Sequence, residues 1–210
     1  MGLFSRSPKG PAKLHIGSGD KRLEGWVNID LKPLPGVDVV ADVTRGLQFS
    51  DAEAVFAEHF LEHLRVDDAV RFLAECHRVL APGGAVRIST PNLEWVWITH
   101  YALEGTREEK WARAVRLNRA FHGWGHRFVW NQDSLALALH ACGFTEPRWC
   151  RYGESELAVF QGLERHETYH DTHACPHVII AEARKVEARP QELASLLEYL
   201  NEEFLRHLAG

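Results

Sequence analysis

The sequence predicts a layered α/β domain, in which helices pack against a sheet. Short runs rich in β-branched residues are mixed along the chain with helical patterns, and glycine, proline and aspartate stand at their ends. The 210 residues contain no internal repeat and no linker that would divide them. With 45% hydrophobic and 25% charged residues, the composition is that of one globular domain with a sizeable core.

The first half of the chain contributes most of the predicted sheet. The expected strands are 13–17 (KLHIG), 26–31 (WVNIDL), 37–42 (VDVVAD), 54–60 (AVFAEHF) and 85–90 (AVRIST). A helix is expected over 66–80, because its apolar residues recur at the three- and four-residue spacing of one buried face. Pro82, Gly83 and Gly84 are expected to end this helix.

The second half is expected to be mainly helical. Helices are predicted over 108–121 and 134–141, then late strands over 144–150 and 177–185, and finally an amphipathic helix after Pro190. Residues 92–132 interrupt the alternation of strands and helices. We therefore expect a flexible tail over 1–12 and a single domain over 13–210, with 92–132 as a cap or lid.

Charge and cysteine usage limit the class of protein. The net charge of −5 argues against binding nucleic acid through a basic surface, and no apolar run approaches the roughly 20 residues of a membrane helix. The four cysteines are widely spaced and form no CxxC pair, which favours a reducing cytoplasm. We expect a cytoplasmic protein that acts on a small molecule, with neither nucleic acid nor membrane as a partner. The C-terminal helix leaves a homodimer open.

A glycine-rich turn follows the first strand, in the stretch LHIGSGD. Gly17 and Gly19 allow a tight turn and a close approach of the backbone to a ligand. The dinucleotide pattern GxGxxG is absent, because Arg22 occupies the third glycine position and Asp30 follows too soon. Without a long first helix, no helix dipole can hold a pyrophosphate, so a ligand without phosphate fits better than NAD. A plain tight turn remains open as the other interpretation.

Six blocks in order carry a resemblance to a known family: LHIGSGD, GWVNIDL, VVADV, FAEHFLEHL, AECHRVLAPGGAVRISTPN and LHACGF. In this order they resemble class I S-adenosylmethionine-dependent methyltransferases, in the small bacterial branch whose glycine loop passes directly into GWVNID. The resemblance covers roughly residues 14–144 and, more weakly, the strand VIIAEARK. It implies a Rossmann-like, doubly wound, mostly parallel sheet with a reversed last strand and a helical or loop cap. It also implies S-adenosylmethionine as the cofactor.

The resemblance further implies which residues bind the cofactor: Gly17, Ser18, Gly19, Asp30, Asp42, Val43 and His59. The glycine loop would cradle the methionine part, and Asp30 would hold the ribose. Asp42 and Val43 would border the adenine. His59 would lie near the sulfonium.

Histidines are the candidates for catalysis, because an oxygen or nitrogen acceptor can need a base at neutral pH. The four candidates are His59, His63, His122 and His126. Structural roles remain open: Glu62 could cap the helix after the fourth strand, with His63 packed under a loop. The stretch 122–131 (HGWGHRFVWN) is either a flexible lid or a packed surface loop.

Two further features each have a structural and a functional interpretation. The stretch 164–177 is rich in histidine and suggests zinc, but its spacing matches no standard zinc module, so we predict no metal. Arg113, Arg116 and Arg119 form either a solvated helix face or a site for an anionic substrate.

The predicted function is S-adenosylmethionine-dependent methyl transfer to a small-molecule or saccharide-like acceptor. The alternative is a regulatory or scaffolding protein that binds the cofactor without transferring its methyl group. A nicotinamide-dependent oxidoreductase is disfavoured by the missing GxGxxG. The acceptor is not specified by the sequence, because such folds choose substrates with variable caps.

Overall fold

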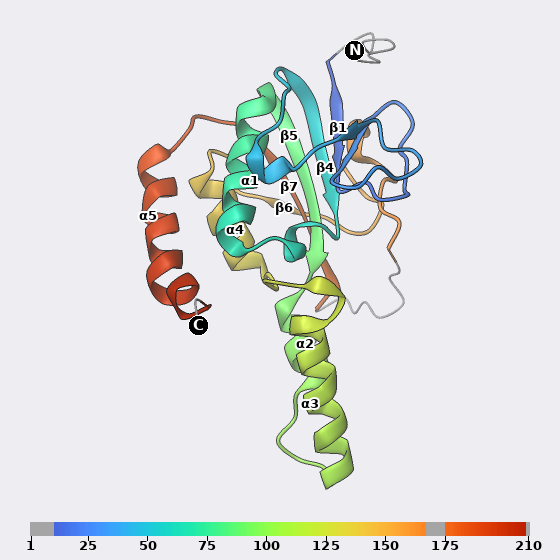
Figure 1. Ribbon diagram of the computed structural model, residues 1–210, viewed down its shortest axis with the longest axis vertical. Helices are drawn as coiled ribbons and strands as arrows, with labels where there is room; N and C mark the ends of the chain where they lie inside the picture. Colours follow the sequence, from blue (N-terminus) through green and yellow to red (C-terminus); the bar gives the residue numbers. More distant parts are fainter. Residues whose placement is uncertain (1–10, 167–174, 209–210) are drawn as a thin grey trace.

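The computed structural model describes residues 11–166 and 175–208. Most of the predicted tail lies outside the described residues, as do His170 and His173. A seven-stranded sheet with the order β3-β2-β1-β4-β5-β7-β6 forms the centre of the molecule (Figure 1). Its strands are β1 (Lys13–Ile16), β2 (Val27–Asp30), β3 (Val39–Val40), β4 (Ala52–Glu58), β5 (Leu80–Pro91), β6 (Arg148–Trp149) and β7 (Val178–Arg184).

The strand directions confirm the predicted sheet. Neighbouring strands from β3 across to β5 are parallel, while β7 runs antiparallel to both β5 and β6. The sheet is therefore mostly parallel with a reversed last strand. Carboxyl ends of parallel strands meet at one edge of such a sheet, where ligands of open α/β folds bind.

The helices are α1 (Val66–Val79), α2 (Leu93–His100), α3 (Arg107–His122), α4 (Gln132–Ala141) and α5 (Pro190–Leu200), which continues through Asn201–Leu205 into α6 (Arg206–Leu208). Figure 1 shows α1 and α4 beside one face of the sheet and α5 outside them, while α2 and α3 extend away from the end of β5. None of the described helices is both long and apolar enough to cross a membrane.

The two faces of the sheet are covered differently. On one face, Val55 and Ala57 of β4 belong to the main core, together with Phe72 and Leu73 of α1. On the other face, Phe56 packs with residues from loops in a smaller apolar cluster that contains Leu23, Trp26, Ala54, Phe56, Ala85 and Phe160. Because the connection from β1 to β2 is too short for a long helix, loop side chains cover this part of the sheet.

Two boundaries differ from the prediction. The helix α1 ends at Val79, and β5 begins directly at Leu80, which pairs with Ala52 of β4. The glycines after Pro82 thus lie within a strand that is longer than predicted. The helix α2 was not predicted, because its apolar residues do not gather on one side. Its local signal is Asn92, whose side chain accepts a hydrogen bond from the Glu94 backbone N–H at 3.0 Å.

Candidate functional site

The glycine loop follows β1 and lies at the carboxyl edge of the sheet. Gly17 has φ +65°, and a side chain there would place its Cβ 2.4 Å from Cδ2 of Phe60. Gly19 has φ +53°, but a Cβ there would meet no atom within 4 Å. Gly17 is therefore required for close packing as well as for backbone conformation, whereas Gly19 leaves open space beside the loop.

Asp30 closes the loop onto the end of β2. Its Oδ2 accepts a hydrogen bond from the Gly19 backbone N–H at 2.9 Å, and its Oδ1 accepts one from the Lys32 backbone N–H at 2.9 Å. Each carboxylate oxygen retains a lone pair for a further donor. Between the glycines, the Ser18 hydroxyl is buried and has no hydrogen-bond partner in the described part of the chain. The geometry thus brings Gly17, Ser18, Gly19 and Asp30 together, and their binding of the cofactor stays a prediction.

Asp42 lies after β3, and its side chain mainly stabilises the turn that follows it. Its Oδ1 accepts hydrogen bonds from the Thr44 backbone N–H at 3.1 Å and from the Thr44 hydroxyl at 2.6 Å, and Arg45 lies 3.1 Å from Oδ2. The Thr44 hydrogen bonds, with the charge of Arg45, hold the pKa of this carboxyl below its usual value. Val43 begins the short turn Val43–Arg45 and is buried.

His59 follows β4 in a left-handed backbone conformation, with φ +46°. Its Nδ1 lies 3.0 Å from Oε1 of Glu62, whose side chain is fully buried. Burial by itself would lower the pKa of His59, but the hydrogen bond and charge of Glu62, together with the charge of Glu58, outweigh burial and raise it. Since a carboxylate can only accept, Nδ1 carries the proton, and Nε2 is the atom left for another partner.

Glu58, the last residue of β4, fixes a distant segment next to His59. Its Oε1 lies 2.6 Å from Nδ1 of His166 and accepts hydrogen bonds from the Arg165 and His166 backbone N–H groups at 2.8 and 3.0 Å. Burial raises the pKa of Glu58, but these hydrogen bonds outweigh burial and lower it. The ring of His166 meets that of His59 edge to face, with centroids 5.2 Å apart.

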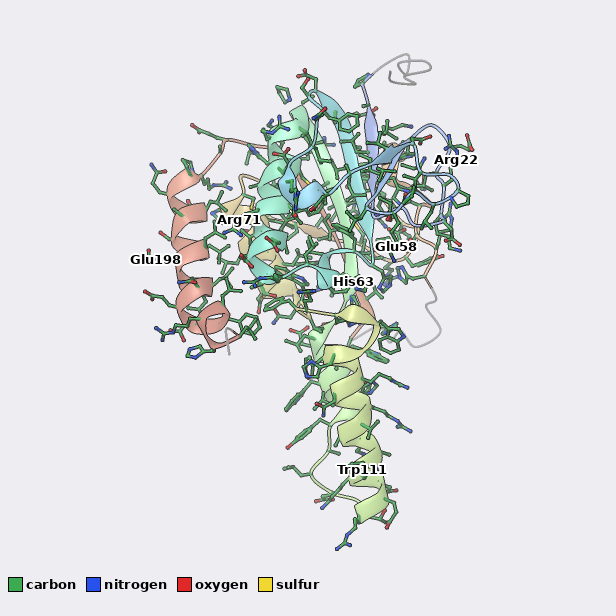
Figure 2. All side chains as sticks on the ribbon, viewed as in Figure 1. Arg22, Glu58, His63, Arg71, Trp111 and Glu198 are labelled. Atoms are coloured by element: carbon green, nitrogen blue, oxygen red, sulfur yellow. The ribbon has the colours of Figure 1, made fainter. Side chains whose placement is uncertain are left out.

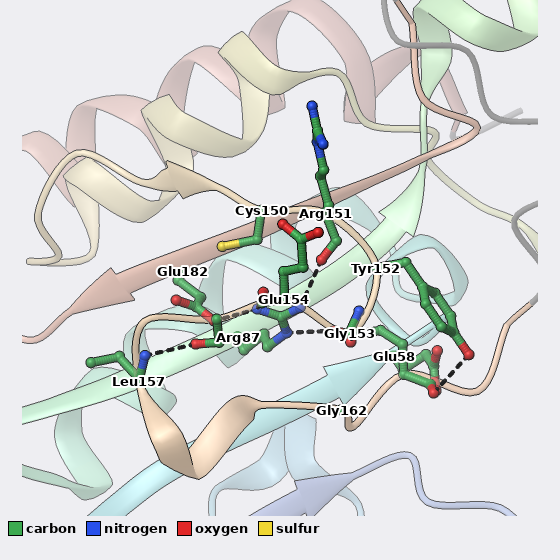
Figure 3. Close-up of polar contacts among 12 residues, drawn as sticks. Glu58, Arg87, Cys150, Arg151, Tyr152, Gly153, Glu154, Leu157, Gly162 and Glu182 are labelled. Atoms are coloured by element: carbon green, nitrogen blue, oxygen red, sulfur yellow. Dashed lines mark hydrogen bonds and ion pairs between the residues drawn. The ribbon is translucent and has the colours of Figure 1, made fainter.

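A buried ionic cluster holds the segment that leads to His166. Arg87 of β5 is fully buried and contacts the carboxylates of Glu164 and Glu182. It also donates to the backbone carbonyls of Glu154 at 3.0 Å and Arg151 at 3.3 Å. Figure 3 shows Arg87 between Glu182 and the stretch from Arg151 to Glu154. Arg87 therefore anchors residues 151–164 to the sheet.

Two of the other predicted histidines, His63 and His126, lie next to each other at the short turn Leu61–His63. The rings of His63 and His126 meet edge to face with centroids 5.2 Å apart. The Arg127 backbone N–H donates to the Glu62 carbonyl at 2.7 Å, which ties the chain beside His126 to this turn. Figure 2 shows His63 near Glu58, below the centre of the sheet. Glu62 does not cap α1, which begins four residues later at Val66 after Arg65.

His122 is not brought into this group. It is exposed at the end of α3, and its ring neighbour is the adjacent Phe121. The turn Gly123–Gly125 separates it from His126, with Trp124 at φ +55° and Gly125 at φ +83°. Two successive left-handed residues reverse the chain, so that His126 returns to the sheet edge while His122 stays on the helix.

The segment 92–132 forms a projecting arm. Its helices α2 and α3 extend beyond the sheet, with Trp111 on the outer part (Figure 2). Trp111 is 72% exposed, whereas Trp130, at the return to the domain, is buried. Arg116 and Arg119 are exposed, and the Arg119 guanidinium lies 5.4 Å from the ring centroid of Trp124.

Sequence reasoning missed the acidic residues that organise the histidines. Glu58 orients His166, and Glu62 contacts His59 and accepts a hydrogen bond from the Thr90 hydroxyl at 3.0 Å. The available signal was the repeated Glu-His pair in EHFLEH, in which the two pairs are four residues apart. The roles of Thr90 and His166 carry no local signal.

The comparisons with known proteins agree with this fold. Residues 24–88, from before β2 into β5, match the model of a methyltransferase domain family, which is less than half of the chain. An S-adenosylmethionine-dependent methyltransferase from Mesorhizobium loti superposes with a TM-score of 0.53 at 15% identity, over 86% of this chain and 94% of that one. One from Thermotoga maritima, described as a possible histamine N-methyltransferase, has a TM-score of 0.54 at 15% identity, over 84% and 82%.

Other matched structures are longer. The chain spans 63% of a possible exported protein from Bordetella parapertussis, with a TM-score of 0.53 and 13% identity over 84% of this chain. It spans about half of two further methyltransferases. No curated protein sequence matches the chain. The chain therefore has the fold of these S-adenosylmethionine-dependent methyltransferases, and the family match from β2 to β5 supports a methyltransferase.

Proposed function

We propose that the chain binds S-adenosylmethionine at the carboxyl ends of β1, β2 and β3 and transfers its methyl group to a small-molecule or saccharide-like acceptor. This cofactor supplies a methyl group on a sulfonium, which an acceptor atom displaces in line. The protein then has to position the two reactants, exclude water and, for some acceptors, remove a proton. The methyltransferase-domain match and the fold support this proposal.

The observation that carries the proposal is the cradle formed by Gly17–Gly19 and Asp30. Open space lies beside Gly19, and the buried Ser18 hydroxyl has no partner among the described residues. A buried hydroxyl without a hydrogen bond costs roughly 1–3 kcal/mol, so a ligand that pairs with it would be favoured. Asp30 keeps lone pairs for two ribose hydroxyls while its backbone contacts hold the loop in place.

Proton removal is assigned to His59. Glu62 holds Nδ1 of His59, and this fixes the tautomer whose Nε2 can accept a proton from the acceptor. The rings of His63 and His126 instead pack against each other, with one nitrogen of each within 4.8 Å of a carboxylate oxygen of Glu62. His122 is assigned no catalytic role, because it lies exposed on α3.

The acceptor class rests on one aromatic residue near the histidines. Trp124 is 69% exposed, and its ring lies 5.7 Å from that of His126. An exposed indole face beside polar groups suits a sugar ring or another flat or cyclic molecule.

The cofactor assignment is tested by calorimetric titration with S-adenosylhomocysteine, comparing the native chain with Asp30→Asn and Glu53→Gln. Both variants replace a carboxylate by an amide, but Glu53 lies exposed near the opposite end of β4. Hydrogen bonds to charged groups contribute roughly 1.5–3 kcal/mol, so Asp30→Asn should weaken binding about 10- to 100-fold. Glu53→Gln should bind like the native chain.

The melting temperature of Asp30→Asn shows whether the loop itself has collapsed. Native protein that fails to bind S-adenosylhomocysteine would refute the proposal, and the glycine loop would then be a plain turn.

A further inference from the structure

We propose that Glu62, His63 and His126 form a binding site for one divalent metal ion, with Zn²⁺ as the ion that the donor set fits best. One ligand atom from each residue lies within 4.8 Å of those of the other two. The site shares Glu62 with the proposed methyl-transfer site, because Glu62 also holds Nδ1 of His59. The described residues of the stretch that the sequence singled out for zinc, 164–166 and 175–177, are not among these three ligands.

The carboxylate of Glu62 is the first argument for a cation. Its side chain is fully buried, its ion-pair partner is the imidazole of His59, which is charged only when protonated, and among the described residues no lysine or arginine pairs with it. A buried carboxylate is unfavourable unless a positive charge or a set of donors compensates for its lost hydration. His59 and Thr90 donate one hydrogen bond to each oxygen, which leaves further lone pairs free on both oxygens. A metal ion would add a fixed positive charge beside this buried carboxylate.

His126 is prepared as a ligand by its backbone contact. Its Nδ1 lies 2.9 Å from the Ala120 carbonyl oxygen, which can only accept, so Nδ1 carries the proton. The remaining Nε2 lone pair is the one that can bind a metal. A ligating histidine typically donates its other N–H to a carbonyl or carboxylate in this way, and that contact fixes the ring orientation.

Backbone hydrogen bonds hold the segments that carry these three side chains close together. Arg127 and Phe128 directly follow His126 in the sequence. Their backbone N–H groups both donate to the Glu62 carbonyl, at 2.7 and 3.3 Å. The left-handed pair Trp124 and Gly125 turns the chain from α3 toward this contact. The cluster is thus built by a local turn and a specific backbone pairing between two distant segments.

The donor set selects the ion. Two imidazoles and one carboxylate suit Zn²⁺, which takes nitrogen and oxygen ligands at about 2.0–2.2 Å in a tetrahedral shell. Ligand atoms in such a shell are roughly 3.4 Å apart, so small side-chain rotations would close the present cluster. Mg²⁺ and Ca²⁺ prefer shells made of oxygen and fit poorly. Three protein ligands leave a fourth position for water or another small ligand.

The test is titration of Zn²⁺ into full-length protein without a histidine tag, after a chelator has removed bound metal. The native chain should bind one equivalent at this site. His126→Ala and His63→Ala should each weaken that binding at least about tenfold, the loss that even an outer-shell partner can cause. His122→Ala is the matched control, since it removes an exposed histidine four residues earlier and should bind like the native chain.

Zinc K-edge absorption on the one-to-one complex identifies the ligands. Two imidazoles and an oxygen near 2.0–2.1 Å are expected, whereas a sulfur near 2.3 Å would place the ion on a cysteine. Melting of the metal-free variants checks that they remain folded, and both substituted histidines are only half-buried. Unchanged zinc binding in both folded variants, a sulfur ligand, or no binding by the native chain would overturn the proposal.

Discussion

Replacing Arg87 by methionine tests how the segment 151–164 is held against the sheet. Arg87 is fully buried, and it is the cation of both Glu164 and Glu182, which are 2% and 5% exposed. Its guanidinium also donates to two backbone carbonyls of this segment. Methionine fills a similar volume but leaves both carboxylates buried without their partner.

The expected loss is large. Removing one partner of a buried ion pair costs roughly 3–5 kcal/mol, and two carboxylates left side by side favour the upper end of this range. In a domain of this size each kcal/mol lowers the melting temperature by about 2–4 °C, so Arg87→Met should melt roughly 10–20 °C lower. Arg148→Met is the control, because Arg148 of β6 pairs with Glu156 and their side chains are 48% and 77% exposed. Such surface pairs contribute about 1 kcal/mol or less.

Urea unfolding at pH 7 followed by tryptophan fluorescence measures both free energies. A second variant, Arg87→Met with Glu164→Gln and Glu182→Gln, should regain part of the loss, because it removes the charges that were left unpaired. A free energy of unfolding for Arg87→Met within about 1 kcal/mol of the native value would refute the reasoning. So would a triple variant that is less stable than Arg87→Met.

Two further predictions follow from the site. Gly17→Ala should be less stable than Gly19→Ala in urea unfolding, since both adopt positive φ but only the first Cβ would collide with Phe60, and overpacking costs roughly 1–3 kcal/mol; equal losses would contradict the contact. The pKa of Glu58 is lowered in the folded chain. Its contribution to folding stability is therefore present at pH values above its ordinary pKa of 4.5 and is lost as the pH falls through its pKa in the folded state. The stability difference between native protein and Glu58→Gln should therefore shrink from pH 7 to pH 3, and a constant difference would exclude the ionised Glu58–His166 contact.

Local sequence signals were sufficient for most of the fold. The helix α1 was predicted because its apolar residues share one face, and its start at Val66 is as expected. The short strands β1 and β2 were predicted from β-branched runs that end in glycine or aspartate. Such signals work because helix and strand periods differ and because capping and turn residues act over only a few positions.

The limits of local signals are visible at α2 and β5. The helix α2 has no one-sided apolar stripe, since most of it extends from the domain as part of the arm. The early start of β5 depends on the pairing of Leu80 with Ala52, which a local glycine pattern does not reveal. In both places a contact or an environment outside the segment decided the structure.

Some residues of the candidate site could likewise be placed from the sequence, and others could not. Gly17, Gly19 and Asp30 could be placed from the sequence alone, because they follow the first two strands and parallel strands end at one edge. The residues that contact the histidines could not be predicted from the sequence. His126 meets Glu62 only because the return of the chain after α3 pairs its backbone with a turn after β4, and His166 meets Glu58 because Arg87 anchors residues 151–164. Contacts between distant segments depend on the shape of the whole core, so they are decided only when the tertiary structure forms.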